Sequence, residues 1–176
     1  MVPLSSLLEE IISFSASMED FTIVDANDDG STWGFDGNYN MVAYTANSSN
    51  AADDWFITPS INMQKGAAYK FSFDAVNDYP TERVAAAVGT DATAEAMTDI
   101  VIEPTEVTYQ PRRRTLSGTF RATEDGMRYF GIHAISDADC NHLYVDNLNV
   151  TEVSASAPDS PADLVVTPGE KGATTA

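Results

Sequence analysis

The sequence predicts an all-β domain, a β-sandwich of two antiparallel sheets with little helix. Three observations support this class. Apolar and polar residues alternate in several short runs, turn residues separate these runs, and only two short segments have a helical pattern. With 176 residues, of which 43% are hydrophobic, the chain is long enough to bury a core of its own.

The two segments with a helical pattern are both short. Residues 6–12 begin with a capping box, Ser6-x-x-Glu9, and residues 92–97 form a brief second candidate. Neither segment is long enough to build a layer. We therefore expect a short helix or strand in an N-terminal segment, residues 1–13, ahead of the sandwich.

The predicted strands follow from alternation. Residues 69–75 alternate strictly between apolar and polar side chains, which indicates a strand with one buried face. Turn residues lie at 64–66, 77–80 and 124–126. Three further runs show similar alternation, and each places its apolar residues on one face. These residues are Trp55, Ile57, Ile61 and Met63 in the first run, Val84, Ala86 and Val88 in the second, and Phe130, Ile132 and Ala134 in the third.

The last predicted strand changes face in its middle. Leu143 and Val145 have one parity, whereas Leu148 and Val150 have the other. The strand must therefore slip by one residue near Asp146, which indicates a β-bulge. Such a bulge would turn the Asp146 side chain off its regular face.

The composition changes after residue 153. Residues 154–161 are rich in Ser, Ala and Pro, which is typical of a linker between domains. Residues 162–176 resemble the first strand and turn of a fibronectin type III domain. We expect a fragment of a longer multidomain chain, with one domain at residues 14–153 and the start of a further β module after the linker.

The charge of the chain restricts its partners. Its 27 acidic and 9 basic residues give a net charge of -18, which repels nucleic acid and anionic lipid surfaces. No apolar run reaches the roughly 18 residues that a membrane span needs, so we expect no membrane insertion. No basic residue precedes Lys65, so we expect no secretory signal within this fragment, from which a signal could have been removed. The acidity favours an exported protein, secreted or on the cell surface.

One acidic stretch has the spacing of a cation site. Asp25, Asn27 and Asp29 place three oxygen side chains at alternate positions, and Gly30 permits a sharp turn. Calcium prefers such ligands, and a metal would constrain a domain whose lone Cys140 cannot form an internal disulfide. The alternative is a polar turn without metal. Asp36 lies at the last position of an EF-hand loop, but it is shorter than Glu and no helices flank it, so we reject an EF-hand.

Three stretches in order carry a resemblance to a known family: residues 25–33, residues 52–61 and residues 143–150. They resemble the cleaved-adhesin family, the MAM-like, gingipain-type adhesin modules of bacterial surface and secreted proteins. The resemblance spans residues 14–153 and implies a calcium-stabilised jelly roll used for attachment, often followed by fibronectin type III domains. In a jelly roll the last strand commonly lies near the start of the domain, so we add Asp146 as a fourth calcium ligand. The alternative for Asp146 is a carboxylate that guards a strand edge.

The sequence gives no sign of catalysis. His133 lies within an alternating strand and suits a structural role, whereas His142 is expected in a turn. Cys140 and His142 could share a strand face, but no third group is evident that would complete a site with a thiol nucleophile. No pair of carboxylates stands out as a general acid with a raised pKa beside an ionised partner. We expect residues 112–114, all Arg, to balance neighbouring acids, with an anion site as the alternative. The chain is therefore predicted not to be an enzyme.

Several aromatic residues fall outside the inferred core: Trp33, Tyr39, Tyr44, Tyr79 and Tyr144. Trp33 follows the acidic stretch and is expected to cover it, although it is also a possible ligand-binding residue. Tyr79 beside Pro80 is the best exposed candidate for binding a ligand.

We expect a noncatalytic adhesion or binding module of an exported bacterial multidomain protein, which binds a host protein, a matrix component or a glycan and adjoins other domains of its chain. The alternatives are a carbohydrate-binding module of a polysaccharide-degrading enzyme and a purely structural spacer.

Overall fold

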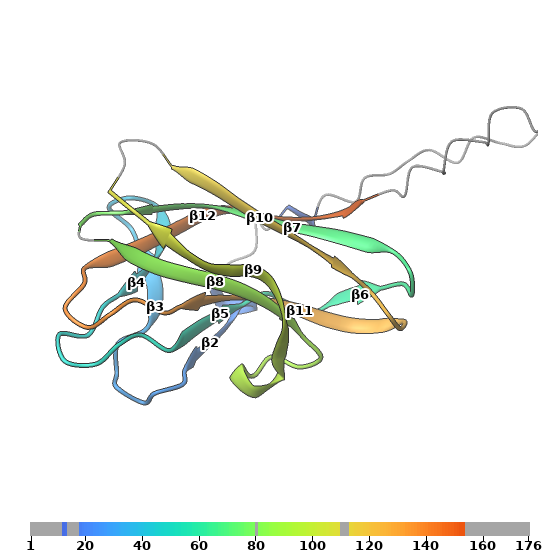
Figure 1. Cartoon of the computed structure of the whole chain (residues 1–176), viewed down its shortest axis with the longest axis horizontal. Coiled ribbons are helices and arrows are strands. Elements are labelled where there is room, and N and C mark those ends of the chain that lie inside the picture. Colours follow the sequence, from blue (N-terminus) through green and yellow to red (C-terminus); the bar gives the residue numbers. More distant parts are fainter. Residues whose placement is uncertain (1–11, 14–17, 80, 110–112, 154–176) are drawn as a thin grey trace, which may run out of the picture.

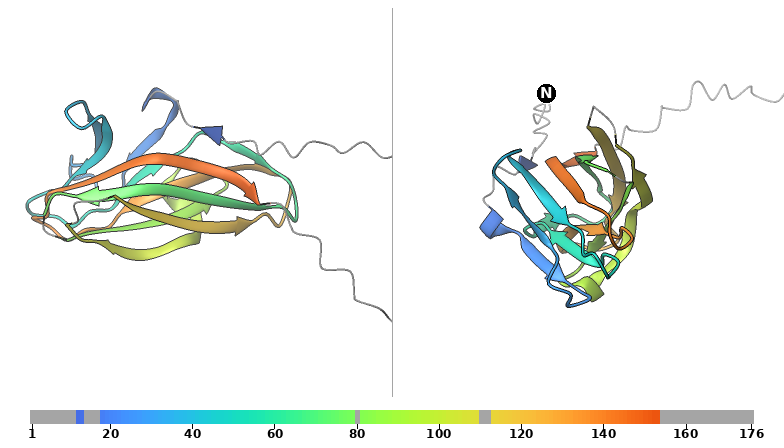
Figure 2. Two further views of the ribbon diagram at one scale, coloured as in Figure 1. Left: turned by 90° about the horizontal axis from the view of Figure 1, so that it is seen from above. Right: turned by 90° about the vertical axis from the view of Figure 1, so that its left-hand side faces the viewer.

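The structure is a computed structural model that describes residues 12–13, 18–79, 81–109 and 113–153. Within these residues the chain forms two antiparallel sheets of six strands each, packed face to face as a jelly-roll β-sandwich. The view along the strands shows the two layers of the sandwich facing each other (Figure 2). The predicted all-β fold class is therefore confirmed.

The strands divide between two sheets, which we call sheet A and sheet B. Sheet A has the order β10-β7-β12-β4-β3, with β1 also paired to β12, and sheet B has the order β2-β5-β11-β8-β9, with β6 also paired to β11. The strands of sheet A are β1 (Ile12–Ser13), β3 (Trp33–Asp36), β4 (Met41–Thr45), β7 (Ala68–Asn77), β10 (Arg114–Arg121) and β12 (His142–Val153). The strands of sheet B are β2 (Thr22–Asp25), β5 (Asp54–Ile57), β6 (Ile61–Met63), β8 (Glu82–Gly89), β9 (Met97–Val107) and β11 (Gly126–Ala134).

The core lies between the sheets and follows the predicted alternation. The inward residues of β7 include Phe71 and Phe73, and those of β11 include Phe130 and Ile132, all fully buried. The rings of Phe71 and Phe130 stack with centroids 4.8 Å apart, so this contact joins the two sheets. The predicted inward faces of β7, β8 and β11 are confirmed.

The single face predicted for residues 54–63 is wrong in its first half. Trp55 and Ile57 pack with Ala87 and Met97 in a second cluster outside the main core, whereas Phe56 faces the core. Ile61 and Met63 do lie in the core, as predicted. The chain gains one residue against β11 between β5 and β6, since Ile57 pairs with Gly131 and Ile61 with Arg128. This extra residue reverses the parity, as in a β-bulge.

The helical candidate at residues 92–97 is shorter than predicted. Residues 92–97 contain only one 3-10 turn, η2 (Ala94–Ala96), capped by the Thr93 side chain, and Met97 already begins β9. A second 3-10 turn, η1 (Met18–Asp20), precedes β2. Of the candidate at residues 6–12 only Ile12 is described, and it lies in strand β1. The predicted linker and further β module lie outside the described residues.

One glycine closes a side of the sandwich. Strand β10 of sheet A passes so close to β9 of sheet B that a Cβ atom on Gly118 would lie 1.8 Å from the carbonyl oxygen of Val101. Only a residue without a side chain permits this approach of two backbones.

No helix among the described residues is long and apolar enough to cross a membrane.

Candidate functional site

Four loops meet at one end of the sandwich, which we call the loop end: residues 26–32, residues 46–53, residues 78, 79 and 81, and residues 135–141 (left in Figure 1). Backbone hydrogen bonds join them. Ala26 N donates to the carbonyl oxygen of Asp53, and Asp139 N donates to that of Asn47. Asp78 N donates to the carbonyl oxygen of His142, at the start of β12. The loops therefore form one connected surface rather than separate tips.

The structure brings three of the four predicted calcium ligands together, in residues 25–30, the acidic loop. Asp25 accepts hydrogen bonds from Asp29 N at 3.2 Å and from Gly30 N at 2.8 Å. Asn27 Nδ2 donates to Asp29 Oδ2 at 3.2 Å and to the carbonyl oxygen of Ala51 at 2.8 Å. Gly30 has a φ of +82°, the conformation for which glycine was singled out in the sequence.

A further carboxylate, Asp54, lies beneath the acidic loop. It pairs with Asp25 across β2 and β5, it is fully buried, and its Oδ1 has no hydrogen-bond partner in the described part of the chain. Burial, together with the negative charges of Asp25 and Asp29, raises the pKa of Asp54 to about 6. Sequence reasoning missed Asp54 because it placed Trp55 and Ile57 on the inner face of the strand. Phe56 occupies that face instead, and Asp54, two residues before it, lies on the same side.

The donors at this place are the oxygen ligands that calcium prefers. No three His, Cys, Asp or Glu side chains in the described ranges lie close enough together to hold a metal ion by themselves. A cation at the acidic loop would therefore be held by carboxylates together with amide or carbonyl oxygens, such as that of Asn27. The uncompensated negative charge around buried Asp54 fits such a cation.

The fourth predicted ligand, Asp146, lies in a different polar group. The predicted bulge is present, since the register of β12 against β7 shifts between Asp146 and Asn149, and Asn147 has a φ of +52°. Asp146 pairs across the sheet with Asp74, and its carboxylate forms an ion pair with Arg113. Arg113 thus balances an acid, as predicted for the Arg run.

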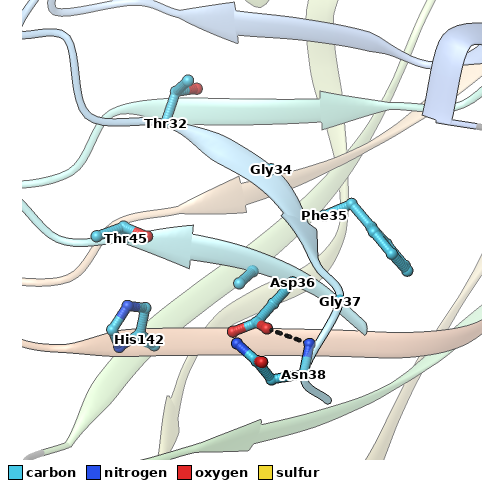
Figure 3. Close-up of a pocket in the computed structure, with 9 residues that line it drawn as sticks. Thr32, Gly34, Phe35, Asp36, Gly37, Asn38, Thr45 and His142 are labelled. Atoms are coloured by element: carbon cyan, nitrogen blue, oxygen red, sulfur yellow. Dashed lines mark hydrogen bonds between the residues drawn. The ribbon is translucent and has the colours of Figure 1, made fainter. Parts of the chain in front are cut away.

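A cavity of about 340 Å³ opens on sheet A where β3, β4 and the start of β12 meet (Figure 3). The polar side chains that line it include those of Asp36, Asn38 and His142, and Phe35 lies at its rim. Asp36 Oδ1 accepts a hydrogen bond from Asn38 N at 2.8 Å, which fixes the carboxylate in the turn after β3. A second cavity of about 360 Å³ has Asn62, Gln64 and Glu152 among its lining residues.

Aromatic rings continue from the first cavity along the outer face of sheet A. The Tyr39 and Tyr144 rings meet edge to face with centroids 5.2 Å apart, and the His142 ring stacks on Tyr144 at 5.7 Å. We call Tyr39, His142 and Tyr144 the aromatic strip. The Tyr144 hydroxyl donates a hydrogen bond to an Asp78 carboxylate oxygen at 3.1 Å. Burial is the larger cause of a raised Tyr144 pKa, and the Asp78 carboxylate raises that pKa further. The turn predicted for His142 is wrong, because this residue begins β12 opposite Thr45.

The two predicted ligand-binding aromatics have opposite environments. Tyr79 is 74% exposed in the turn between β7 and β8. Trp33 is only 3% exposed, and its Nε1 donates to the carbonyl oxygen of Asp54 at 3.1 Å, so it covers the interior below the acidic loop. Tyr44, expected outside the core, is fully buried within it. Phe35, 57% exposed, is an aromatic side chain that lines the first cavity, and Tyr39, 60% exposed, lies in the turn that follows β3 and contacts Tyr144.

The residues weighed for catalysis have structural surroundings. His133 Nε2 lies 2.6 Å from Asp53 Oδ1, and the imidazole stacks on Trp55 at 3.9 Å. Burial lowers the pKa of His133, and burial raises the pKa of the Cys140 thiol, with the charge of Glu82 adding to that rise. A cysteine with a raised pKa is a poor nucleophile at neutral pH. His133 lies within strand β11, as predicted, and its imidazole has both a hydrogen-bond partner and a stacking partner.

Comparison with known proteins yields likeness of fold. No protein-family model matches the sequence, and no curated protein matches it. The K1 cleaved adhesin domain of Lys-gingipain from Porphyromonas gingivalis W83 is 18% identical with a TM-score of 0.60, over 80% of this chain and 96% of that one. A CBM4 protein is 15% identical with a TM-score of 0.57, over 77% and 96%. The CBM22-1 xylan-binding domain of Paenibacillus barcinonensis Xyn10C is 15% identical with a TM-score of 0.56, over 83% and 94%.

Proposed function

We propose that this chain is a noncatalytic binding module of an exported multidomain protein, and that it binds carbohydrate on the outer face of sheet A. The observation that carries the proposal is the cavity beside the aromatic strip. The exposed ring of Tyr39, in the turn after β3, offers a flat apolar surface, and Asp36 and Asn38 offer polar atoms in the cavity. Sites for small polar ligands combine these two elements, since rings supply contact area and a few fixed polar groups supply orientation.

Charge narrows the class of sugar. The net charge is -18, and Asp36 and Asp78 lie at the cavity and the aromatic strip, respectively. Sulfated or uronic sugars would be repelled from such a surface. The ligand is therefore a neutral or amine-bearing glycan, whose hydroxyl or ammonium groups donate to the carboxylates. A xylan-binding domain and a cleaved adhesin domain are among the proteins of similar fold, which supports a binding module whose ligand is a glycan.

The direct test is isothermal titration of the protein with neutral xylo- and cello-oligosaccharides, chitosan oligosaccharides and heparin fragments. We expect binding of a neutral or amine-bearing glycan and none of heparin. Asp36→Asn should weaken that binding roughly 10- to 100-fold, because a hydrogen bond to a charged group contributes about 1.5–3 kcal/mol. Asp99→Asn, an exposed carboxylate on β9 of the other sheet, is the matched control and should bind as the parent does.

Other results would redirect the function. Binding to a purified matrix protein but to no glycan would favour an adhesin for a protein ligand, and no binding to either would favour a structural spacer. Turnover of peptide, ester or glycoside substrates that survives repurification would contradict the noncatalytic proposal.

We further propose that calcium stabilises the module at the acidic loop, with Asp25, Asn27, Asp29 and buried Asp54 in its surroundings. The observation in favour is buried Asp54: its Oδ2 accepts a hydrogen bond from Asp53 N at 3.2 Å, but its Oδ1 has no hydrogen-bond partner among the described residues, and a buried carboxylate is costly without a counter-ion. Calcium at about 100 times its dissociation constant should add about 2.7 kcal/mol to the free energy of unfolding. Coincident thermal melts in excess calcium and in chelator would remove calcium from the account.

A further inference from the structure

The two sides of the sandwich, where an edge of sheet A faces an edge of sheet B, differ in how closely their strands approach. On one side β10 and β9 come so close that Gly118 has no room for a Cβ atom. On the other side sheet A ends with β3 and sheet B with β2, and each of these strands pairs with one neighbour in the described part of the chain. Figure 2 shows β2 (blue) and β3 (cyan) on the same side of the molecule, opposite β9 and β10. We call the side formed by β2 and β3 the open side.

The backbone of β3 points hydrogen-bonding groups out of the sheet at this side. Thr45 N donates to the carbonyl oxygen of Thr32, and the register of β3 against β4 places these two residues directly opposite each other. Hydrogen-bonded and non-hydrogen-bonded pairs alternate along antiparallel strands. The N–H and C=O groups of Trp33 and Phe35 therefore point away from β4, toward the free edge. A further strand could pair with them.

Two large apolar side chains are exposed at the open side although they have the parity of core residues. Phe35 is 57% exposed, whereas Trp33, two residues before it on the same face of β3, is buried in the main core. Ile23 of β2 is 38% exposed and pairs with Phe56, which is also buried in the main core. The rings of Trp33 and Phe56 lie 6.0 Å apart, so Phe35 and Ile23 flank the same part of the core. In Figure 3 the Phe35 ring points away from Asp36, so this carboxylate does not cover the ring.

The surroundings of the open side are acidic. Glu19 and Asp20 directly precede β2, Asp25 ends β2, and Asp36 ends β3. No Lys or Arg occurs in the sequence before Lys65. A second copy of the chain would bring its own net charge of -18 to this side and would be repelled. The charge therefore favours a cationic partner.

We propose that the free edge of β3 binds an extended, lysine- or arginine-bearing segment of another protein by strand addition. The backbone of that segment pairs with Trp33 and Phe35, one of its apolar side chains covers the Phe35 ring, and its cations lie near the acidic residues around β2 and β3. Protein edges of this kind are commonly protected by Lys, Pro or a bulge, but β3 has the sequence Trp-Gly-Phe-Asp and contains neither Lys nor Pro. This surface is the edge of sheet A, whereas the proposed carbohydrate site lies on its outer face.

The test is titration of the isotope-labelled full chain at low salt with three synthetic peptides, followed through amide chemical shifts. The first peptide alternates Lys and Val, the second is the same peptide N-methylated at every amide, and the third alternates Glu and Val. We expect the first to bind, with the largest shifts at Trp33 and Phe35, and the other two to bind at least about 10-fold more weakly, because one lacks hydrogen-bond donors and the other has the wrong charge. Equal affinity of the two Lys peptides would show attraction by charge alone and would overturn the proposal, as would no binding of the first peptide or shifts centred on β9.

A substitution at the exposed ring is the second arm of the test. Phe35→Ser should weaken binding of the Lys-Val peptide about 10-fold, because it removes the apolar anchor beside the pairing edge. Ile100→Ser is the matched control, since Ile100 is 59% exposed on β9, the edge strand of the opposite side, and this variant should bind as the parent does. Equal affinity of parent and Phe35→Ser would refute the assignment to β3. The comparison of the peptides uses the parent chain alone, so it decides the question even if Phe35→Ser fails to fold.

Discussion

Asp54 shows how one buried side chain couples pH to stability. Its pKa in the folded protein is about 6, above the roughly 3.9 of an unfolded Asp, so the folded state binds the proton more tightly. Its contribution to stability is therefore full below about pH 4 and is lost as the pH rises through 6. A shift of about two units corresponds to about 3 kcal/mol, which the apo protein loses between these pH values.

We therefore predict that Asp54→Asn flattens the pH dependence of the melting temperature between pH 4.5 and 7 in chelator. The parent should lose stability relative to the variant as the pH rises, because only the parent must ionise a buried carboxyl. The proposed calcium site predicts the reverse order in calcium at pH 7, since the variant lacks the charge proposed to attract the cation. Parallel curves for parent and variant across this range in chelator would contradict the pKa assigned to Asp54.

At the residue level the sequence located polar groups but not their burial. The spacing of Asp25, Asn27 and Asp29 predicted a turn with converging oxygens, because that geometry is local in the chain. Asp54 was missed because its burial depends on which face of a strand meets the other sheet. Asp146 was placed at the acidic loop by the usual strand order of a jelly roll, yet Arg113 and Asp74 surround it here.

At the level of elements, alternation predicted β7, β8 and β11 because each has one face in the core throughout its length. It failed at β5, where both faces of the strand are buried. Phe56 packs in the main core between the sheets, whereas Trp55 packs on the outer face of sheet B in the second cluster, which includes Ala94 of η2. A strand buried on both faces gives no alternating signal. The bulge at Asp146 was predictable because it reverses the parity of apolar residues within one strand.

Gly118 provides a prediction about the contact between elements. Gly118→Ala should destabilise the fold by about 1–3 kcal/mol or more, because the added methyl group meets the Val101 carbonyl and must push β10 from β9. Chemical denaturation measures the loss. The matched control is Gly34→Ala on β3, where a Cβ meets no atom within 4 Å. If both variants unfold at the same denaturant concentration, the close approach of β10 and β9 is not required.

At the scale of the whole molecule, β12 contributes the last core residue in the described part of the chain. Val150 is the last residue of the main core cluster, and β12 ends at Val153. We therefore predict that truncation after Val153 leaves the melting temperature nearly unchanged. A large loss of stability would show that residues of the predicted further β module, such as Leu164 and Val166, contribute to this domain. Limited proteolysis between residues 154 and 162 is a second check, since rapid cleavage there supports a linker.

The central claim is that one face of the sandwich, the outer face of sheet A, binds carbohydrate. Mapping of amide chemical shifts in the labelled protein, titrated with the tightest oligosaccharide from the binding panel, tests it most directly. We predict that the largest changes fall on β3, on the turn containing Asp36 and Asn38, and on His142 and Tyr144 of β12. Changes concentrated instead at the second cavity, around Asn62 and Glu152, or on the outer face of sheet B around Trp55 and His133, would contradict the claim.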